Sequence, residues 1–263
     1  MSASALITLT TDFGADSPYV AAMKGVILSI NAGAKIVDVT HAVPPQDVRR
    51  GALVLDEATP WFPAGTIHVA VVDPGVGSSR RIVYAQFGKQ QYIAPDNGLL
   101  SRLALRGPAS RMISLEAPEF WLPRVSATFH GRDIMAPAAA RLSQGLSPER
   151  LGPPTTDFVK LVWPEVVILP RTIKGSVESI DSFGNLVTDV TEQMLADVPR
   201  DERVKIACDE HETLGIFRTY ADQPPATLLA LIGSHGKLEL AIVGDSAAAM
   251  LGIRAGMPVV VSW

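Results

Sequence analysis

Cysteine is nearly absent from this sequence, which has 263 residues and a single cysteine, Cys208. One cysteine cannot form an internal disulfide framework, so nothing points to an oxidising compartment, and we expect Cys208 to be a small buried apolar residue. Long apolar runs are also missing, because no stretch reaches the roughly 20 residues of a membrane span. The first residues lack the basic region and cleavage site of a signal peptide. We therefore expect a cytoplasmic protein that does not enter a membrane.

An excess of basic residues is also lacking. The chain has 23 lysines and arginines against 27 aspartates and glutamates, which gives a formal net charge of -4. The charge pattern of a nucleic-acid-binding protein is therefore absent, and an anionic membrane surface is an unsuitable partner. These observations favour a small-molecule ligand.

The remaining composition is typical of a compact globular protein. The sequence is 47% hydrophobic and 19% charged, and it contains 20 prolines and 21 glycines, so we expect tight connections and no long disordered segment. Its length allows one large domain or two modest ones.

Through the first two-thirds of the chain, short apolar runs alternate with segments of helical periodicity. This alternation is the pattern of a mostly parallel sheet with helices on its faces. The runs Ala5–Thr11, Lys35–Thr40 and Thr66–Asp73 predict strands. Ser17 is a good N-cap for a first helix, and the segment Asp47–Trp61 predicts a second.

Further elements are expected before residue 152. Two short strands are predicted at Ile82–Gln86 and Gln91–Ala94. A helix is predicted near Gly98–Leu105, and another begins just beyond Asp133. Together these elements complete an N-terminal α/β domain.

The pattern changes after Gly152, where prolines punctuate a connector and closely spaced short strands follow. Such strands with turn signals are typical of a small β-barrel or sandwich. The predicted strands are Lys174–Ile180, Asn185–Val190, Val204–Cys208, Leu214–Tyr220, Leu228–Ile232, Lys237–Val243 and Val259–Trp263. We predict an α/β protein whose N-terminal, mostly parallel sheet is flanked by helices, plus a C-terminal all-β, barrel-like domain. The predicted boundaries are 1–160 for the α/β domain, 161–172 for the connector and 173–263 for the barrel.

Three polar clusters adjoin the predicted elements, at residues 10–17, 73–81 and 129–133. Ligands of an open α/β sheet bind outside the carboxyl ends of its strands, so we expect these clusters to converge at one edge. They supply several carboxylates, a guanidinium and an imidazole, with glycines that let a ligand approach the backbone. Each cluster alone also has a simpler interpretation, with the aspartates as turn or cap residues and the histidine as a hydrogen-bonded loop residue.

The clusters belong to a longer series of motifs that covers nearly the whole chain. The motifs are Leu9-Thr-Thr-Asp12-Phe-Gly14, Tyr19 through Met23-Lys-Gly-Val-Ile27, Val72-Asp73-Pro-Gly-Val-Gly77 with Arg80, Pro95-Asp-Asn-Gly98, Phe129-His130-Gly-Arg-Asp133, Asp181-Ser-Phe-Gly-Asn185, and Ser234-His-Gly236 running into Leu238-Glu-Leu-Ala241. In this order they resemble the adenosine-forming S-adenosylmethionine hydrolases, or hydroxide adenosyltransferases, which are related to fluorinase and chlorinase. The resemblance implies an N-terminal α/β domain, a C-terminal β-barrel and a homotrimer with sites between subunits.

The resemblance also implies hydrolysis of S-adenosylmethionine to adenosine and L-methionine. We expect no metal and no other cofactor, because the sequence lacks metal-ligand spacing and the leaving group needs no Lewis acid. The resemblance places the family's hydrolytic residues on Asp73, Arg80 and His130, and Arg80 is preferred over Arg81 because the family's arginine stands seven residues after the aspartate. A neutral water is a poor nucleophile, so it must be held in line with the carbon–sulfur bond at C5′ beside a proton acceptor. Asp73 and His130 are the candidate acceptors.

Contacts with the substrate are implied in the same way. The implied substrate-binding residues are Asp12 for the ribose hydroxyls, Asp16, Ser17 and Asp181 for the methionine amino group, Phe183 and Asn185 for the adenine, and Ser234 for the methionine carboxylate. The halogenating relatives carry an arginine next to that serine, where this chain has His235. Water rather than halide is the expected nucleophile, because Asp73 stands where those enzymes have an uncharged residue and the long insertion of fluorinase is missing.

Two other functions stay open at this point. A metal-dependent hydrolase of nucleoside phosphates could use Asp12, Asp16, Asp73 and His130 as ligands, and loss of activity in a chelator would identify it. A non-catalytic protein could instead bind S-adenosylmethionine or adenosine and release no methionine.

Overall fold

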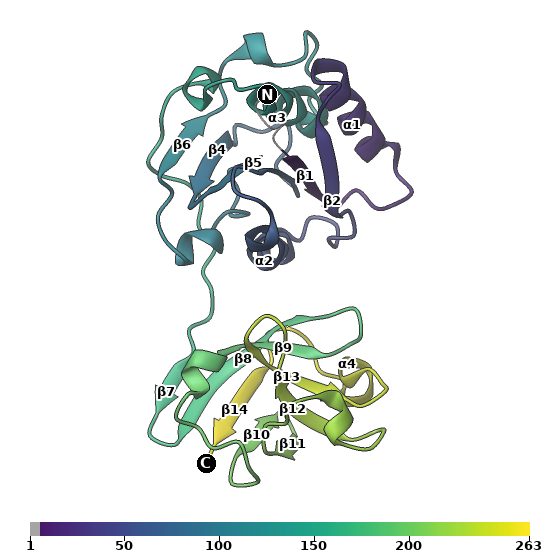
Figure 1. Cartoon of the computed structure of the whole chain (residues 1–263), viewed down its shortest axis with the longest axis vertical. Helices are drawn as coiled ribbons and strands as arrows, with labels where there is room; N and C mark the ends of the chain where they lie inside the picture. The colour runs from purple at the N-terminus through teal and green to yellow at the C-terminus, as the bar shows by residue number, and fades with distance from the viewer. Residues whose placement is uncertain (1–5) are drawn as a thin grey trace. The chain divides into compact units, whose positions relative to one another are not determined.

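The computed structural model describes residues 6–263 of the chain (Figure 1). The chain forms two compact units, Met1–Leu161 and Val162–Trp263. The first unit is mixed α/β, and the second consists mainly of β-strands. No helix within residues 6–263 is long and apolar enough to cross a membrane.

A six-stranded sheet forms the centre of the first unit. Its strands are β1 (Leu6–Thr11), β2 (Lys35–Thr40), β3 (Ile67–Val71), β4 (Ile82–Phe87), β5 (Gln90–Pro95) and β6 (Arg111–Ser114). They are arranged in the order β2-β1-β3-β5-β4-β6. The pairs β1/β2, β1/β3 and β3/β5 are parallel, and β4 is antiparallel to both β5 and β6. The predicted mostly parallel sheet is confirmed, and the carboxyl ends of β1 and β3 lie side by side.

Helices cover both faces of this sheet (Figure 1). They are α1 (Pro18–Ile30), α2 (Val48–Ala58) and α3 (Ala136–Ser143). As predicted, α1 begins after Ser17, whose hydroxyl accepts a hydrogen bond from the Tyr19 N–H at 3.2 Å. Met23 of α1 shares a buried core with α3 on one face, whereas Leu55 of α2 packs into the core on the other.

Strand β3 is buried on both faces of the sheet, so both faces must be packed against helices. All five of its residues are buried. Ile67, Val69 and Val71 pack into the core shared with α1 and α3, and Ala70 packs into the core shared with α2. A strand buried on both faces is apolar along most of its length, and its rigid packing fixes the start of the loop that follows.

The helix predicted near Gly98–Leu105 is wrong. This segment forms turns that end in a single 3₁₀ turn, Leu103–Leu105. Gly98 has a φ of +105°, which is outside the helical range. The Ser101 N–H and hydroxyl both donate to the Gly98 carbonyl, at 3.0 and 2.6 Å. A local turn therefore replaces the first turn of the expected helix.

The second unit is a nearly closed antiparallel barrel. Its elements are β7 (Val167–Leu169), β8 (Thr172–Ile180), β9 (Leu186–Thr191), β10 (Lys205–Cys208), β11 (His211–Leu214), β12 (Leu228–Ile232), β13 (Lys237–Ile242), the short helix α4 (Ala247–Leu251) and β14 (Pro258–Ser262). The strand order is β11-β10-β14-β8-β9-β13-β12, and β7 pairs with β8. Near the two end strands, the Thr213 hydroxyl donates to the Leu228 carbonyl at 3.0 Å, and the Phe217 N–H donates to the Ala230 carbonyl at 2.8 Å. The predicted barrel-like domain is confirmed.

The strand predicted at Leu214–Tyr220 is wrong. β11 ends at the first of these residues, because Gly215 adopts a φ of +78° and turns the chain. Phe217 then makes one isolated parallel bridge to Leu231, and a 3₁₀ turn follows at Tyr220–Asp222. The apolar residues of this segment therefore belong to a loop packed on the barrel.

Candidate active site

The loop after β3 holds Asp73 and Arg80 together. Asp73 lies two residues beyond the end of β3, and the Val76 N–H donates to the Asp73 carbonyl at 3.2 Å, which starts a tight turn. The turn brings the Arg80 guanidinium back onto the Asp73 carboxylate, where Nε donates to Oδ1 at 3.0 Å and Nη2 donates to Oδ2. The two side chains are only 10% and 5% exposed, so solvent screens this bidentate pair weakly.

His130 joins this pair from the other side. It precedes a wide helical turn, Gly131–Met135, that runs directly into α3. Nδ1 of His130 lies 3.0 Å from Nη2 of Arg80. A guanidinium can only donate, so Nδ1 must accept this hydrogen bond and the neutral ring carries its proton on Nε2. Burial and the Arg80 charge lower the pKa of His130, against the opposing charges of Asp73 and Asp133, which favours this neutral form.

Gly77 allows the His130 loop to approach the Asp73 loop. Its φ is +79°, and a Cβ added there would lie 2.5 Å from the Ala127 carbonyl oxygen. A side chain at this position would therefore both strain the turn and push away the segment that leads to His130.

Arg81, the neighbouring arginine, has different partners. Its Nη2 donates to the buried Asp96 carboxylate at 2.7 Å, and its Nη1 donates to Asp157 at 3.1 Å. Asp96 also accepts the Val159 N–H at 2.7 Å. Arg81 thus fastens residues 155–159 to the end of β5, and Arg80 is the arginine that contacts Asp73 and His130.

Asp12 lies at the carboxyl end of β1, beside the end of β3. Its Oδ2 accepts the Gln46 N–H at 2.8 Å, while Oδ1 accepts no hydrogen bond from residues 6–263. Farther along the same loop, Asp16 is exposed and the Ser17 hydroxyl caps α1. The first unit thus contains Asp12, Asp16 and Ser17 in one loop at the sheet edge that also carries the Asp73 loop.

Three aromatic rings stand beside this loop, and the motif analysis had assigned them no role. Phe13, Tyr19 and Phe129 contact one another edge to face, with ring centroids 5.2 to 5.7 Å apart. The Arg132 guanidinium lies over the Phe129 ring at 4.9 Å. These rings form an apolar wall next to His130. Their position within the Asp12, Tyr19 and His130 motifs was the only sequence signal for them.

In the second unit, Asp181 organises the turn between β8 and β9. Its Oδ1 accepts the N–H groups of Phe183 and Asn185, both at 2.9 Å, and its Oδ2 accepts the Asn185 side-chain amide at 3.0 Å. The turn leaves the Phe183 ring 78% exposed, although Asn185 is buried. The structure thus brings Asp181, Phe183 and Asn185 together in one turn.

A cavity of about 490 Å³ adjoins this turn. Its lining residues are Phe183, Asn185, Tyr220, Ile242, Gly244, Asp245 and Ser246. Tyr220, which the motif analysis had not singled out, donates its hydroxyl proton to the Glu239 carboxylate. Burial of Glu239 raises its pKa, and the nearby Asp181 charge adds to the increase. An exposed ring beside buried polar groups is suited to a flat heteroaromatic ligand.

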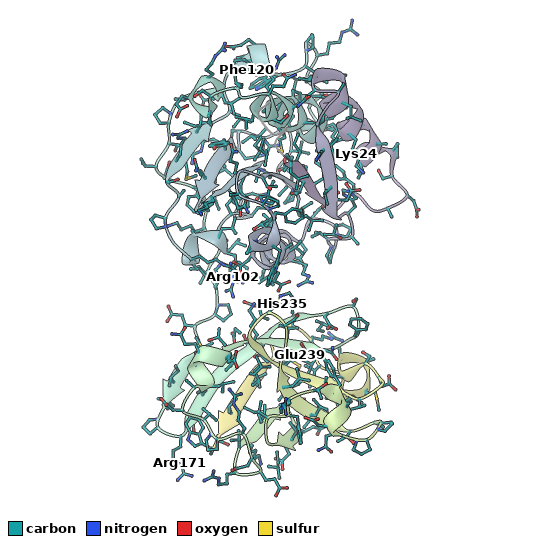
Figure 2. All side chains as sticks on the ribbon, in the orientation of Figure 1. Lys24, Arg102, Phe120, Arg171, His235 and Glu239 are labelled. Atoms are coloured by element: carbon teal, nitrogen blue, oxygen red, sulfur yellow. The ribbon has the colours of Figure 1, made fainter. Side chains whose placement is uncertain are left out.

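Ser234 lies in the turn between β12 and β13, outside the lining of that cavity. It is exposed, as is the adjacent His235, which Figure 2 shows near Glu239. The Gly233 N–H and the Lys237 carbonyl close the turn at 2.9 Å. Ser234 therefore belongs to the same unit as Asp181, but within residues 6–263 no hydrogen bond joins it to the Asp181 turn.

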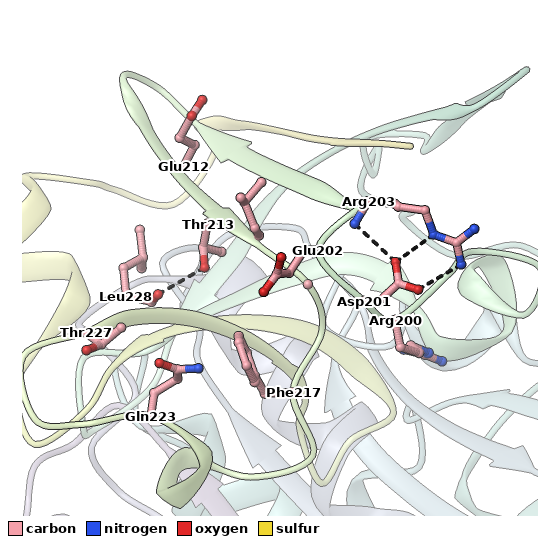
Figure 3. Close-up of a pocket in the computed structure, with 12 residues that line it drawn as sticks. Arg200, Asp201, Glu202, Arg203, Glu212, Thr213, Phe217, Gln223, Thr227 and Leu228 are labelled. Carbon is pink, nitrogen blue, oxygen red and sulfur yellow. Dashed lines mark hydrogen bonds and ion pairs between the residues drawn. The ribbon is translucent and has the colours of Figure 1, made fainter.

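A larger groove of about 910 Å³ follows the seam between β11 and β12 (Figure 3). Asp201 accepts two hydrogen bonds from the Arg203 guanidinium there, each 2.8 Å long. The groove contains none of the residues predicted to bind substrate or act on it. Its size therefore does not make it the candidate site.

Metal-binding geometry offers a test of the metallohydrolase alternative. Among residues 6–263, no group of three or more histidine, cysteine, aspartate or glutamate side chains is arranged to hold an ion. Both Asp73 oxygens instead accept hydrogen bonds from Arg80, and a cation in that place would face the positive charge of Arg80. These residues therefore do not fit a shared metal site.

Comparison with known proteins finds relatives that span both units. Residues 7–152 match the SAM hydroxide adenosyltransferase N-terminal domain, and residues 175–260 match the corresponding C-terminal domain. The chain is 40% identical to the (R)-S-adenosyl-L-methionine hydrolase of Thermus thermophilus, over 95% of this chain and 96% of that protein. It is 27% identical to a fluorinase of Actinopolyspora mzabensis, over 97% of this chain and 96% of the other.

A solved structure gives the same result for the fold. An uncharacterized conserved protein from Thermotoga maritima superposes with a TM-score of 0.93 at 34% identity, covering 98% of this chain and 100% of that one. The match of both family domains, the long alignment with a hydrolase and this superposition all agree. The chain therefore belongs to the SAM hydroxide adenosyltransferase family.

Proposed function

We propose that this chain hydrolyses S-adenosyl-L-methionine to adenosine and L-methionine, by in-line attack of water on C5′. The main observation in support is the contact of Asp73, Arg80 and His130 beside the carboxyl ends of β1 and β3. Membership of the family and the alignment with named hydrolases support the same substrate.

The chemistry places its main demand on the water. The sulfonium leaves as a neutral thioether, so its departure needs no acid. The attacking water must be held in line with the carbon–sulfur bond and must lose a proton as the new bond forms. The trio therefore has to orient a water and accept its proton.

The hydrogen bonds assign different tasks to the three side chains. Arg80 occupies Nδ1 of His130, so the neutral ring presents an Nε2–H donor that can orient the water. Each carboxylate oxygen of Asp73 receives one hydrogen bond from Arg80 and keeps a further lone pair. We therefore assign proton acceptance to Asp73, orientation of the water to His130 and alignment of both to Arg80.

Substrate binding is proposed for the remaining residues. Asp12 offers the free Oδ1 to the ribose hydroxyls, and the exposed Phe183 ring beside the buried Asn185 offers a surface for adenine. Asp16, Ser17 and Asp181 are proposed for the methionine amino group and Ser234 for its carboxylate. Ser17 and Asp181 already make local hydrogen bonds, so each would use a remaining lone pair.

The assembly and setting follow the same proposal. We propose a cytoplasmic homotrimer in which residues 1–160 carry the catalytic groups, 161–172 form a connector and 173–263 form the barrel domain. The net charge of -4 supports a small-molecule substrate rather than nucleic acid or a membrane surface. Sedimentation velocity would test the trimer.

A product assay tests the proposed activity. The protein is incubated with S-adenosylmethionine in excess chelator, and the products are separated by chromatography. Equal amounts of adenosine and methionine are expected. Loss of activity that magnesium restores would favour the metal-dependent hydrolase, and tight binding without methionine release would favour the non-catalytic binding protein.

A further inference from the structure

His41, a residue outside every predicted site, contacts the Asp12 loop at two points. Its Nδ1 lies 2.9 Å from the hydroxyl oxygen of Thr11, the residue directly before Asp12. Its backbone carbonyl accepts the Gly14 N–H at 2.8 Å. The Thr11 hydroxyl oxygen also accepts the Phe13 N–H at 3.2 Å. His41 therefore holds the backbone on both sides of Asp12.

Asp38, itself bound by Lys24, lies on the other side of the His41 ring, facing Nε2. Nε2 of His41 lies 3.1 Å from Oδ1 of Asp38, and Lys24 of α1 donates to Oδ2 of Asp38 at 2.6 Å; Figure 2 shows Lys24 on the α1 side of the sheet. Burial raises the pKa of Asp38, but the hydrogen bond from Lys24 and the close contact with His41 outweigh it and bring the pKa below its usual value. Asp38 is thus an anion that fixes the orientation of His41.

The surroundings of His41 favour one position for the proton of its neutral ring. The Asp38 carboxylate faces Nε2 at 3.1 Å, a charge contact without the angle of a hydrogen bond, and its negative charge favours the His41 proton on that nitrogen. Nδ1 must then accept the Thr11 hydroxyl proton, which leaves the Thr11 oxygen free to accept from Phe13. Thr11 is fully buried, so water cannot replace His41 as its partner without opening the site.

The same segment also binds the Asp12 side chain. Gln46, which adopts a left-handed backbone with φ of 65°, donates its N–H to Oδ2 of Asp12. The Val43 N–H donates to the Thr11 carbonyl at 3.4 Å. Residues 41–46 therefore determine both the backbone and the carboxylate direction of Asp12.

We propose that His41 is a positioning residue that sets Asp12 for recognition of the substrate's ribose diol, and so contributes to selection of ribonucleosides over 2′-deoxynucleosides. The inference rests on the proposed function, because it takes Asp12 as the ribose ligand. Two hydroxyls can share one carboxylate only within narrow limits of direction. His41 supplies that direction through Thr11.

Two substitutions of His41 separate this role from a general structural one. In His41→Asn, the amide oxygen stands close to the position of Nδ1 and can still accept from Thr11. In His41→Gln, the longer side chain reaches toward Asp38 and leaves the Thr11 hydroxyl without an acceptor. Both variants keep the backbone carbonyl that binds Gly14. The proposal therefore predicts that they differ.

The experiment measures calorimetric binding of adenosine and of 2′-deoxyadenosine, after the product assay has been run on the unaltered protein. His41→Gln should reduce the preference for adenosine about tenfold, the effect of weakening one charge-assisted hydrogen bond, while His41→Asn keeps most of it. In turnover assays His41→Gln should raise KM and change kcat less than about twofold, since it does not touch the reacting atoms. In an Asp12→Ala background, His41→Gln should cause no further loss of preference.

An unchanged preference in folded His41→Gln would overturn the proposal, as would equal losses in both variants. If His41→Gln does not fold, Thr11→Val against Thr11→Ser repeats the comparison, because only serine keeps the hydroxyl. The proposal then requires loss of the preference in the valine variant alone. Failure of the proposed function would be recognised separately, by an unaltered protein that releases no methionine.

Discussion

Arg80 is the residue on which the candidate site depends, because its guanidinium contacts both Asp73 and His130. A cation shared by an anion and a neutral ring fixes the distance between them and the tautomer of the ring. Removing any one member therefore disturbs the other two. Substitutions of these three residues should therefore affect kcat in a way that is not independent.

The first prediction concerns that dependence. Asp73→Asn and His130→Ala should each reduce kcat by about 10²–10⁴, the range typical of general acid–base groups, with little change in KM. The double variant should be much less impaired than the product of the two effects, because both side chains act on the same water. His211→Ala in β11 serves as a histidine control and should leave kcat unchanged. Multiplicative losses, or full turnover in His130→Ala, would refute the shared role.

The sequence could predict part of this site and not the rest. The carboxyl ends of β1 and β3 meet in a parallel sheet, so the approach of the Asp12 and Asp73 loops followed from the strand pattern. The choice of Arg80 over Arg81 rested on the motif spacing, and only the structure shows Arg81 bound to Asp96. His41 was missed because its contact with Thr11, 30 residues earlier in the chain, arises by tertiary folding, which no local pattern reports.

At the scale of elements, the loop after β3 works only if it can approach the segment before His130. Gly77 makes this approach possible, whereas Gly88, in the turn between β4 and β5, also has a positive φ of 56° but would meet nothing within 4 Å on gaining a Cβ. The two glycines thus form a matched pair. A side chain at position 88 would cause backbone strain alone, whereas a side chain at position 77 would cause both strain and a collision with the Ala127 carbonyl.

The second prediction uses this pair. Gly88→Ala should cost about 1–2 kcal/mol of folding stability through left-handed backbone strain and leave kcat unchanged. Gly77→Ala should lose more stability and also lower kcat, because the Ala127 carbonyl and the His130 segment must move. Urea unfolding and steady-state kinetics check both effects. Equal stability losses and equal kcat values in the two variants would contradict this account.

Prediction of the elements succeeded where burial determines the pattern. Continuous apolar runs predicted β1 and β3, and Cys208 is 2% exposed, as expected. The false helix near Gly98 and the false strand after Leu214 share one cause. In both segments a glycine with positive φ redirects an apolar stretch into packed turns, and hydrophobicity alone does not distinguish such turns from regular structure.

At the scale of the whole molecule, acid stability should depend on one histidine inside the first unit. His68 of β3 is fully buried, stacks on Tyr92 and has its Nδ1 2.7 Å from the Thr8 hydroxyl. Burial lowers the pKa of His68 to about 4. Between the ordinary histidine pKa of about 6.5 and this value, the unfolded chain binds a proton that the folded protein does not.

The third prediction follows from this difference. Above about pH 6.5, titration of His68 does not change the free energy of unfolding. As the pH falls toward 4, titration of His68 lowers the free energy of unfolding by up to about 3 kcal/mol. His68→Asn, which keeps a polar atom for Thr8 and does not titrate, should be less stable at pH 7 but lose less stability on acidification. Urea unfolding at pH 7 and 4.5 measures this, with His211→Ala as the control. The same pH dependence in His68→Asn and the unaltered protein would show that His68 does not carry the effect.

The central claim, attack of water on C5′, is tested most directly by turnover of S-adenosylmethionine in oxygen-18 water with excess chelator. The account predicts adenosine and methionine in equal amounts, with one labelled oxygen in the 5′-hydroxyl of adenosine and none in methionine. Unlabelled adenosine would contradict it. So would methylthioadenosine with homoserine, which would place the attack on the methionine chain instead.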